Sequence, residues 1–260
     1  MIYLYNLIVY LSSILIFIGS FFSKKLNQLH NGRKKIKKYL KTIKITNEEK
    51  IWIHVSSVGE FEQAKSIIYQ FKKNLKLKIF VTFFSPSTEK VIKNFKLVDY
   101  SCYIPEDSKD KISYLYKKIN PKILLIIKYE FWYYLINEGK KMNVPVVSIS
   151  SIFRENQIYF NQFNFFSKIL KSITYFYVQN EESRSLLNSI GIKNVKVVGD
   201  TRFDRVYDIY KESKNYPKIE KFLKKNQTLI IGSSWKSDIK ILKEGILKND
   251  KLKFIIAPHN

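Results

Sequence analysis

Short apolar runs alternate with amphipathic stretches along most of the chain. Runs of four to seven residues, rich in β-branched and aromatic side chains, predict buried strands at 51–55, 78–84, 123–127, 144–149, 175–179 and 195–198. Between them, apolar residues recur every three or four positions, which predicts helices at 62–75, 107–119, 132–142 and 181–190. This alternation is typical of an α/β protein whose parallel sheet is covered by helices on both faces.

A second strand–helix–strand pattern follows Tyr216-Pro217. We expect a strand at 228–231, a turn at Gly232-Ser233-Ser234, a helix at 238–247 and a strand at 253–256. Two strands and one helix cannot bury their faces alone. We therefore expect this unit either to dock on the first domain or to open a second one.

The amino-terminal segment has a different character. Residues 2–22 carry no formal charge and consist mainly of Leu, Ile, Tyr, Val and Phe, close to the roughly 20 residues that cross a bilayer. Eight Lys and Arg residues follow between Lys24 and Lys41, a flank that favours a cytoplasmic position for the remainder. A shallow interfacial helix and a buried first helix of the domain are the alternatives.

These patterns divide the chain into four parts. We expect a membrane anchor at 1–23, a basic linker at 24–50, a first domain at 51–216 and the second unit at 217–260. The anchor and its basic flank predict a location at the cytoplasmic side of a membrane.

Composition limits the classes of function. The 46 Lys and Arg residues against 22 Asp and Glu give a formal charge of +24, which favours an anionic membrane surface or an acidic substrate. Only five of the basic residues are arginine, and Lys, Ile, Asn, Tyr and Phe abound, as A/T-rich codons would produce. We therefore expect no dedicated nucleic-acid function. One cysteine and three scattered histidines do not suggest a disulfide framework or a metal site.

Polar residues gather where the first predicted strand ends, in the sequence Ser56-Ser57-Val58-Gly59-Glu60. Gly59 would allow a ligand to approach the backbone closely, and the following helix offers unpaired amides. Glu60 would lie at the carboxyl end of the strand, where a carboxylate can accept a proton from a substrate hydroxyl. An acid at this position can equally well complement the helix amino terminus.

Two further strand ends carry charged residues. Glu130 follows the strand at 123–127, and Arg202 follows the strand at 195–198. Two acids at two strand ends can share one cleft as a base and a positioning group. Arg202 lies between Asp200 and Asp204, so it could clamp an anion or form only a surface ion pair.

The remaining polar candidates are weaker. His54 lies inside an apolar strand and is interpreted as a hydrogen-bonded core residue. His259, beside Pro258 at a strand end, is better placed for a ligand. Ser233 and Ser234 could present hydroxyls and backbone amides to a phosphate.

Taken together, these segments resemble the Kdo transferase family, the 3-deoxy-D-manno-octulosonic acid transferases that glycosylate the lipid A precursor. Four features match in order: the uncharged anchor with its basic flank, His-x-Ser-Ser-Val-Gly-Glu at 54–60, Tyr-Glu-Phe-Trp at 129–132 and Gly-Asp-Thr-Arg-Phe-Asp at 199–204. The resemblance implies a glycosyltransferase of the B type, with two Rossmann-like domains facing across a cleft. The amino-terminal domain would receive the acceptor lipid and the carboxyl-terminal domain the donor, CMP-Kdo.

The resemblance also implies roles for the acceptor-side residues. Glu60 would be the general base, removing a proton from the acceptor hydroxyl as it attacks the anomeric carbon with inversion. Glu130 and Arg202 match positions that stabilise the transition state. The turn that holds Glu60 would contact the acceptor through Ser56, Ser57 and Gly59. The site would act in lipopolysaccharide biosynthesis at the cytoplasmic face of the inner membrane.

On the donor side, Pro258 and His259 match the start of a CMP-binding motif, and Ser233 and Ser234 would lie with them. No cofactor or metal is expected, because helix dipoles and side chains offset the charge of the leaving phosphate in B-type transferases.

The sequence departs from the family pattern in three ways. Lys128 stands where many relatives carry another acid, and His259 replaces the usual arginine. Relatives also continue far beyond residue 260, so we expect an incomplete donor site and poor CMP binding by the isolated chain. This leaves a membrane-associated, non-catalytic acceptor-binding fragment as the alternative to an active transferase.

Overall fold

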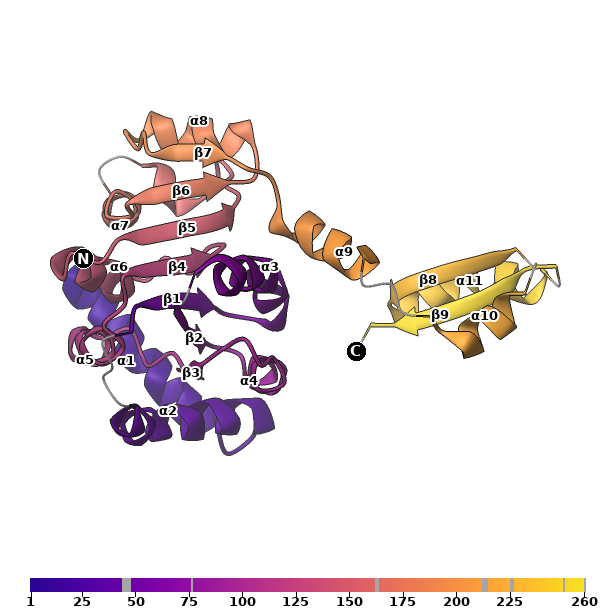
Figure 1. Cartoon of the computed structure of the whole chain (residues 1–260), viewed down its shortest axis with the longest axis horizontal. Coiled ribbons are helices and arrows are strands. Elements are labelled where there is room, and N and C mark those ends of the chain that lie inside the picture. Colours follow the sequence, from indigo (N-terminus) through magenta and orange to yellow (C-terminus); the bar gives the residue numbers. More distant parts are fainter. Residues whose placement is uncertain are drawn as a thin grey trace. The chain divides into compact units, whose positions relative to one another are not determined.

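The first 208 residues form one compact unit built on a seven-stranded parallel sheet. The computed structural model describes residues 1–43, 48–75, 77–161, 164–211, 215–224, 227–249 and 251–259. The strand order is β3-β2-β1-β4-β5-β6-β7. The strands are β1 Lys50–Val55, β2 Lys78–Phe83, β3 Tyr100–Tyr103, β4 Ile123–Ile127, β5 Val146–Ser151, β6 Tyr175–Val178 and β7 Val195–Val197. Figure 1 shows β7, β6, β5, β4 and β1 stacked in this order with their arrowheads pointing the same way.

Helices connect successive strands of this sheet. They are α3 Val58–Asn74, α4 Pro86–Lys93, α5 Lys109–Ile119, α6 Tyr133–Lys141, the 3₁₀ turn η1 Ile158–Phe160, α7 Phe165–Leu170 and α8 Glu181–Ser189. A further helix, α9 Thr201–Lys211, follows β7, the last strand of the sheet. Every residue of β1 is buried, which requires cover on both faces of the sheet. The α/β class with a parallel sheet is therefore confirmed.

Besides the helices α4, α7 and α9 and the 3₁₀ turn η1, two elements of the first unit lie where the sequence analysis expects none. The first is β3, a short edge strand whose first two residues are only half-buried, so it lacks the apolar run that marks the other strands. The second is α2, Lys24–Thr42, in the stretch interpreted as a basic linker. Its Leu29, Ile36 and Leu40 are buried on one face, a pattern that the lysines on the other face obscured. Residues 44–47 of that stretch lie outside the described residues.

The first helix, α1 Ile2–Gly19, is long and apolar enough to cross a membrane by length and composition, and none of its residues is buried. Ile2, Tyr5 and Ile16 pack against the core, while most other apolar side chains of α1 are exposed. The alternative interpretation, in which the first helix is buried inside the domain, is therefore wrong. The helix lies against the domain on one side and presents an apolar surface on the other.

Asp107 holds the beginning of α1 on the domain. The Tyr5 hydroxyl donates to the Asp107 carboxylate at 2.5 Å and accepts from the backbone N–H of Tyr133 at 3.2 Å. The same carboxylate accepts from the backbone N–H groups of Tyr134 and Leu135 at 2.8 and 2.9 Å. One buried acid thus ties α1 to the start of α6.

Residues 209–260 form a second compact unit. It begins eight residues before position 217, where the sequence analysis expects the second unit to start. It contains α10 Pro217–Leu223, β8 Thr228–Ser234, α11 Lys236–Leu247 and β9 Lys253–Pro258, with β8 and β9 parallel. Among its described residues, only Ser234 is buried. The Gly232-Ser233-Ser234 segment is not a turn, since it forms the end of β8.

The pKa of Asp107 predicts how the stability of the first unit depends on pH. Burial raises this pKa to about 6, although hydrogen bonds from Tyr5, Tyr134 and Leu135 oppose the shift. The folded state therefore binds this proton more tightly than the unfolded chain, so the stabilisation is complete below about pH 4 and is lost as the pH rises through about 6. We expect a loss of up to about 3 kcal/mol over that window.

Denaturant unfolding in detergent between pH 4 and 7 measures this effect. In Asp107→Asn, the free energy of unfolding should decrease less steeply with pH over that window than in the wild type. This difference in slope does not depend on how stable the variant is at any one pH. An unchanged slope would show that Asp107 is not the titrating group.

Candidate active site at the ends of β1 and β4

The order of the sheet reverses at β1. This strand pairs with β2 on one side and with β4 on the other, all in parallel. In open parallel sheets a crevice forms at the carboxyl ends of the two strands where the order reverses, because their connections leave toward opposite faces. Glu60 follows β1 and Glu130 follows β4, so the two acids flank this point.

Glu60 is fixed by the start of α3. The Ser57 hydroxyl accepts from the backbone N–H of Glu60 at 3.4 Å, and the Glu60 carboxylate accepts in turn from the backbone N–H of Ser56. This reciprocal arrangement is close to a capping box, so Glu60 does complement the helix amino terminus. The side chain is 9% exposed, which is less open than a catalytic base in a free crevice would be.

Glu130 lies in electrostatic contact with Glu60. Burial raises the pKa of Glu130, and the negative charge of Glu60 raises it further. Hydrogen bonds that the carboxylate accepts from the side chains of Ser56 and Trp132 act in the opposite direction. Two neighbouring carboxyl groups do not ionise together readily, so Glu130 keeps its proton to a higher pH than a free glutamate.

Ser56 joins the two acids. Its backbone N–H donates to Glu60, and its side chain lies near enough to Glu130 to lower the pKa of that carboxyl group. Its own carbonyl accepts from the backbone N–H of Ser85 at 2.8 Å, next to the end of β2. Ser56 therefore contacts Glu60 directly and lies beside Glu130. Its expected contact with an acceptor stays a prediction.

Arg202 reaches the same region from the start of α9. Gly199 just before it has a φ of +84°, a backbone conformation that favours glycine. The guanidinium pairs with Asp200 through Nη2 at 2.5 Å and Nε at 2.7 Å, and the Arg202 side chain is 63% exposed. The surface ion pair foreseen as an alternative is thus present.

Tyr129 lies close enough to several of these charged side chains for them to affect its pKa. Its pKa is raised by burial first, and the charges of Glu60 and Asp200 add to the shift while those of Arg154 and Arg202 oppose it. Segments far apart in the sequence therefore share one electrostatic environment. Arg154 was not among the sequence candidates, and Tyr129 entered only as part of the Tyr-Glu-Phe-Trp motif at 129–132, without a role of its own.

Packing of α9 on α3 keeps Arg202 near Glu60. The Thr201 hydroxyl donates to the Gln63 side-chain oxygen at 3.1 Å. Farther along, Arg205 pairs with Glu62 at 3.0 Å, and the Ser66 hydroxyl donates to Asp208 at 2.9 Å. Since α3 begins at the turn that carries Glu60, these contacts fix the two functional segments relative to each other.

His54 is a core residue, as interpreted from the sequence. Its side chain is fully buried, and Nδ1 lies 2.9 Å from the Thr82 hydroxyl. That hydroxyl also accepts from Trp52 Nε1 at 2.8 Å. Burial lowers the pKa of His54 to about 4, so it is neutral at physiological pH and takes no charged role.

The donor-side candidates come together within the second unit. Ser233 has a φ of +55° at a register shift between β8 and β9, and Ser234 pairs with Pro258. The His259 backbone N–H donates to the Ser234 carbonyl at 2.8 Å. The His259 ring stacks on Trp235, with centroids 4.1 Å apart and planes 18° apart. Trp235 was missed, because a single tryptophan after a serine pair indicates nothing by itself.

Within the described ranges, no group of three or more His, Cys, Asp or Glu side chains is placed to hold a metal ion.

Comparison with known proteins was made for sequence and for fold. A family model described as 3-Deoxy-D-manno-octulosonic-acid transferase (kdotransferase) matches residues 30–205. The chain is 28% identical over 231 residues to a bifunctional glycosyltransferase/methyltransferase of Fusobacterium nucleatum, covering 83% of this chain and 35% of that protein. It is 24% identical over 208 residues to a 3-deoxy-D-manno-octulosonic acid transferase of Rickettsia felis, covering 79% and 44%. The chain thus spans less than half the length of these two relatives.

Among solved structures, the chain is similar to the UDP-GlcNAc 2-epimerase from Neisseria meningitidis bound to UDP-GlcNAc. The TM-score is 0.59 at 17% identity, and the match covers 80% of this chain and 64% of that one. At this identity the likeness is one of fold. It confirms the predicted class, an α/β fold of the glycosyltransferase B type.

Coupling between the two acids predicts a measurable pKa change. Replacing Glu60 with Gln removes the negative charge that raises the pKa of Glu130, so the pKa of Glu130 should fall toward its ordinary value. Carboxyl ¹³C NMR titration of Glu130 measures the shift. Glu181→Gln, an exposed acid on α8, should leave Glu130 unchanged. An unaltered Glu130 titration in Glu60→Gln would contradict the paired arrangement.

Proposed function

The chain belongs to the 3-deoxy-D-manno-octulosonic-acid transferase family, and from this membership we propose that it takes part in transferring Kdo from CMP-Kdo to the lipid A precursor, with inversion. The pairing of Glu60 with Glu130 where the sheet order reverses is the observation that carries the proposal. A transfer to a hydroxyl group needs a base, and a neighbouring carboxyl group with a raised pKa can supply a hydrogen bond to the substrate. The product would enter lipopolysaccharide biosynthesis.

Glu60 acts as the general base in this proposal. Its carboxylate takes the proton of an acceptor sugar hydroxyl while the hydroxyl oxygen bonds to the anomeric carbon of Kdo. The bond from that carbon to the CMP phosphate breaks, and CMP leaves with the electron pair. Attack opposite the leaving group inverts the anomeric carbon. The backbone N–H of Ser56 orients the carboxylate for this step.

Glu130 and Arg202 stabilise the charge that develops. Because its pKa is raised, Glu130 keeps a proton longer than an ordinary glutamate and can donate a hydrogen bond. Arg202 can exchange part of its contact with Asp200 for an anionic group of the substrate, since its side chain is exposed. Ser57 and Gly59, in the same turn as Glu60, would line the acceptor side.

The donor would be held by the second unit. Ser233, Ser234, Pro258 and His259 lie at the ends of β8 and β9, where a parallel sheet binds nucleotides. The stacked ring pair of Trp235 and His259 offers an aromatic surface beside them. Helix α11 begins directly after Trp235, so its positive end can face the leaving phosphate. The proposed chemistry needs no metal or cofactor.

Helix α1 would place the site at the cytoplasmic face of the inner membrane. Its exposed apolar surface suits lipid, and the formal charge of +24 suits an anionic bilayer and an anionic acceptor. A second candidate function is a membrane-associated acceptor-binding fragment without catalysis. It is favoured by the state of Glu60, whose carboxylate already accepts from the backbone N–H of Ser56 and which is largely buried.

The two candidates differ in their response to Glu60→Gln. If the chain transfers Kdo, this change should lower the transfer rate by about 10²- to 10⁴-fold and leave acceptor binding nearly unchanged. Transfer of labelled Kdo from CMP-Kdo to the lipid acceptor in detergent measures the rate, with Glu181→Gln as the control. A full rate in Glu60→Gln would exclude Glu60 as the base. Acceptor binding without transfer by the wild-type chain would favour the second candidate.

Gly59 tests the acceptor side separately. A Cβ at this position would meet only the Ser57 hydroxyl, at 3.9 Å, so Gly59→Ala should fold normally and stabilise α3 slightly, by less than about 1 kcal/mol. If an acceptor approaches the backbone here, the added methyl group should raise KM or Kd for the acceptor several-fold. An unchanged acceptor affinity would remove Gly59 from the binding surface.

A further inference from the structure

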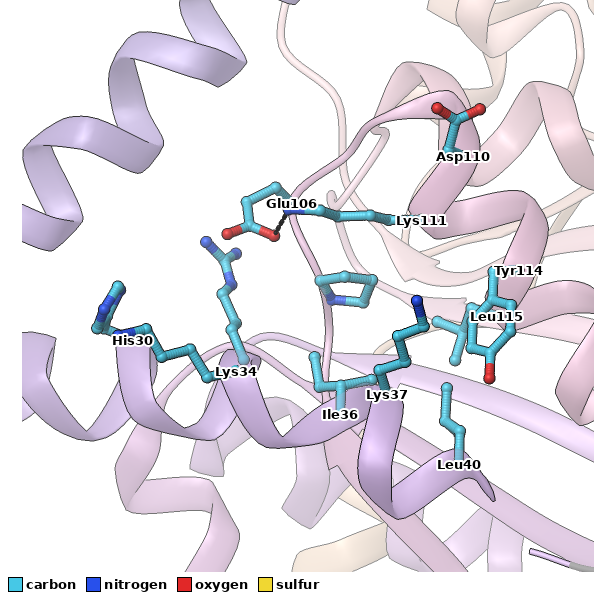
Figure 2. Close-up of a pocket in the computed structure, with 12 residues that line it drawn as sticks. His30, Lys34, Ile36, Lys37, Leu40, Glu106, Asp110, Lys111, Tyr114 and Leu115 are labelled. Carbon is cyan, nitrogen blue, oxygen red and sulfur yellow. Dashed lines mark hydrogen bonds and ion pairs between the residues drawn. The ribbon is translucent and has the colours of Figure 1, made fainter. Parts of the chain in front are cut away.

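A cavity of about 460 Å³ lies between α2 and the segment that leads from β3 into α5. Cavities of this size commonly hold small ligands. Figure 2 shows Lys34 and Lys37 on the α2 side, and Glu106 and Lys111 on the opposite side. None of the residues that line it has a role in the proposed transfer reaction.

The α2 side of the cavity carries unpaired positive charge. Arg33, Lys34 and Lys37 all line it. Within the described part of the chain neither lysine forms an ion pair with a carboxylate, whereas Arg33 donates from Nε to the Ile104 carbonyl at 3.1 Å and interacts electrostatically with Glu106. On the opposite side, Glu106 is already paired with Lys111 at 2.7 Å. Asp110 also lines the cavity, but cations outnumber acids there. Unpaired cations beside a partly enclosed space favour an anionic occupant.

The floor of the same cavity is apolar. Ile36 and Leu40 of α2 and Leu115 of α5 line it and are buried. A small inorganic anion would leave this apolar surface unused. An occupant with both a negative head and an apolar portion would cover the floor and neutralise the cations.

One buried polar atom points to the same class of occupant. His30 lines the cavity, and among the described residues its Nε2 is buried without a hydrogen-bond partner. A buried polar nitrogen of this kind is costly unless a ligand or water satisfies it. The His30 ring also lies against Phe17 of α1, with centroids 5.2 Å apart. The cavity therefore adjoins the helix whose apolar side chains are exposed.

We propose that this cavity binds the phosphate headgroup of an anionic lipid of the bilayer on which α1 rests. Arg33, Lys34 and Lys37 contact the phosphate, His30 donates or accepts one hydrogen bond, and the first part of the lipid covers the apolar floor. The bound lipid holds α2 at the membrane surface beside α1. This site does not depend on the transfer reaction, so it can fail or hold independently of it.

Monomeric short-chain lipid tests the cavity without a membrane surface. Dihexanoyl phosphatidylglycerol, titrated below its micelle concentration into the full chain, should bind in calorimetry. Lys34→Gln combined with Lys37→Gln should weaken binding at least ten-fold. The matched control is Lys35→Gln with Lys38→Gln, which removes two exposed lysines of the same helix that do not line the cavity. It should change affinity by less than about two-fold, because screened surface charges act weakly on a small ligand.

Three results would overturn the proposal. Equal weakening by both double variants would indicate diffuse surface charge. Equal affinity for dihexanoyl phosphatidylcholine would remove the requirement for net negative charge. Equal affinity for inorganic phosphate would identify a free-anion site in place of a lipid site. Both pairs of lysines are exposed, so the variants should keep the thermal unfolding midpoint of the wild-type chain.

Discussion

Parallel pairing of β1 with β2 on one side and β4 on the other is the constraint on which the site depends. It brings two strand ends that are 72 residues apart in the sequence to neighbouring positions, and with them Glu60 and Glu130. Buried strands specify this order strongly, because a central strand needs partners along both edges. The buried strands therefore determine where Glu60 and Glu130 lie, and the polar segments after the strands only supply the side chains.

The sequence predicts the strands of the first domain well because most of them are continuous apolar runs. It does not predict β3, whose Tyr100-Ser101-Cys102-Tyr103 pattern is too short and too mixed, or α2, whose lysines obscure the buried Leu29, Ile36 and Leu40. Glu60, Glu130 and Arg202 can be selected from their places after strands. Their partners cannot, because the contacts of Ser56 with both acids depend on pairing between distant segments.

The two amino-terminal helices carry the features that suit a membrane surface, an apolar exposed face on α1 and a row of cations on α2. The Asp107 carboxylate ties the beginning of α1 to the domain through Tyr5, so the helix lies along the protein on one side. The other side keeps an apolar surface, and α2 adds the cations around the proposed lipid cavity. An acceptor embedded in the same bilayer would then meet the site at a fixed height, since both helices belong to the unit that carries Glu60 and Glu130.

The central claim is that Glu60 is the base and that Glu130 shares its site. A crystal structure with a bound acceptor sugar tests this most directly. The account predicts the reacting hydroxyl at about 2.6–3.2 Å from a Glu60 carboxylate oxygen, with Glu130 contacting the same sugar. A sugar bound away from the ends of β1 and β4, or a Glu60 side chain that still only caps α3 in the complex, would contradict it.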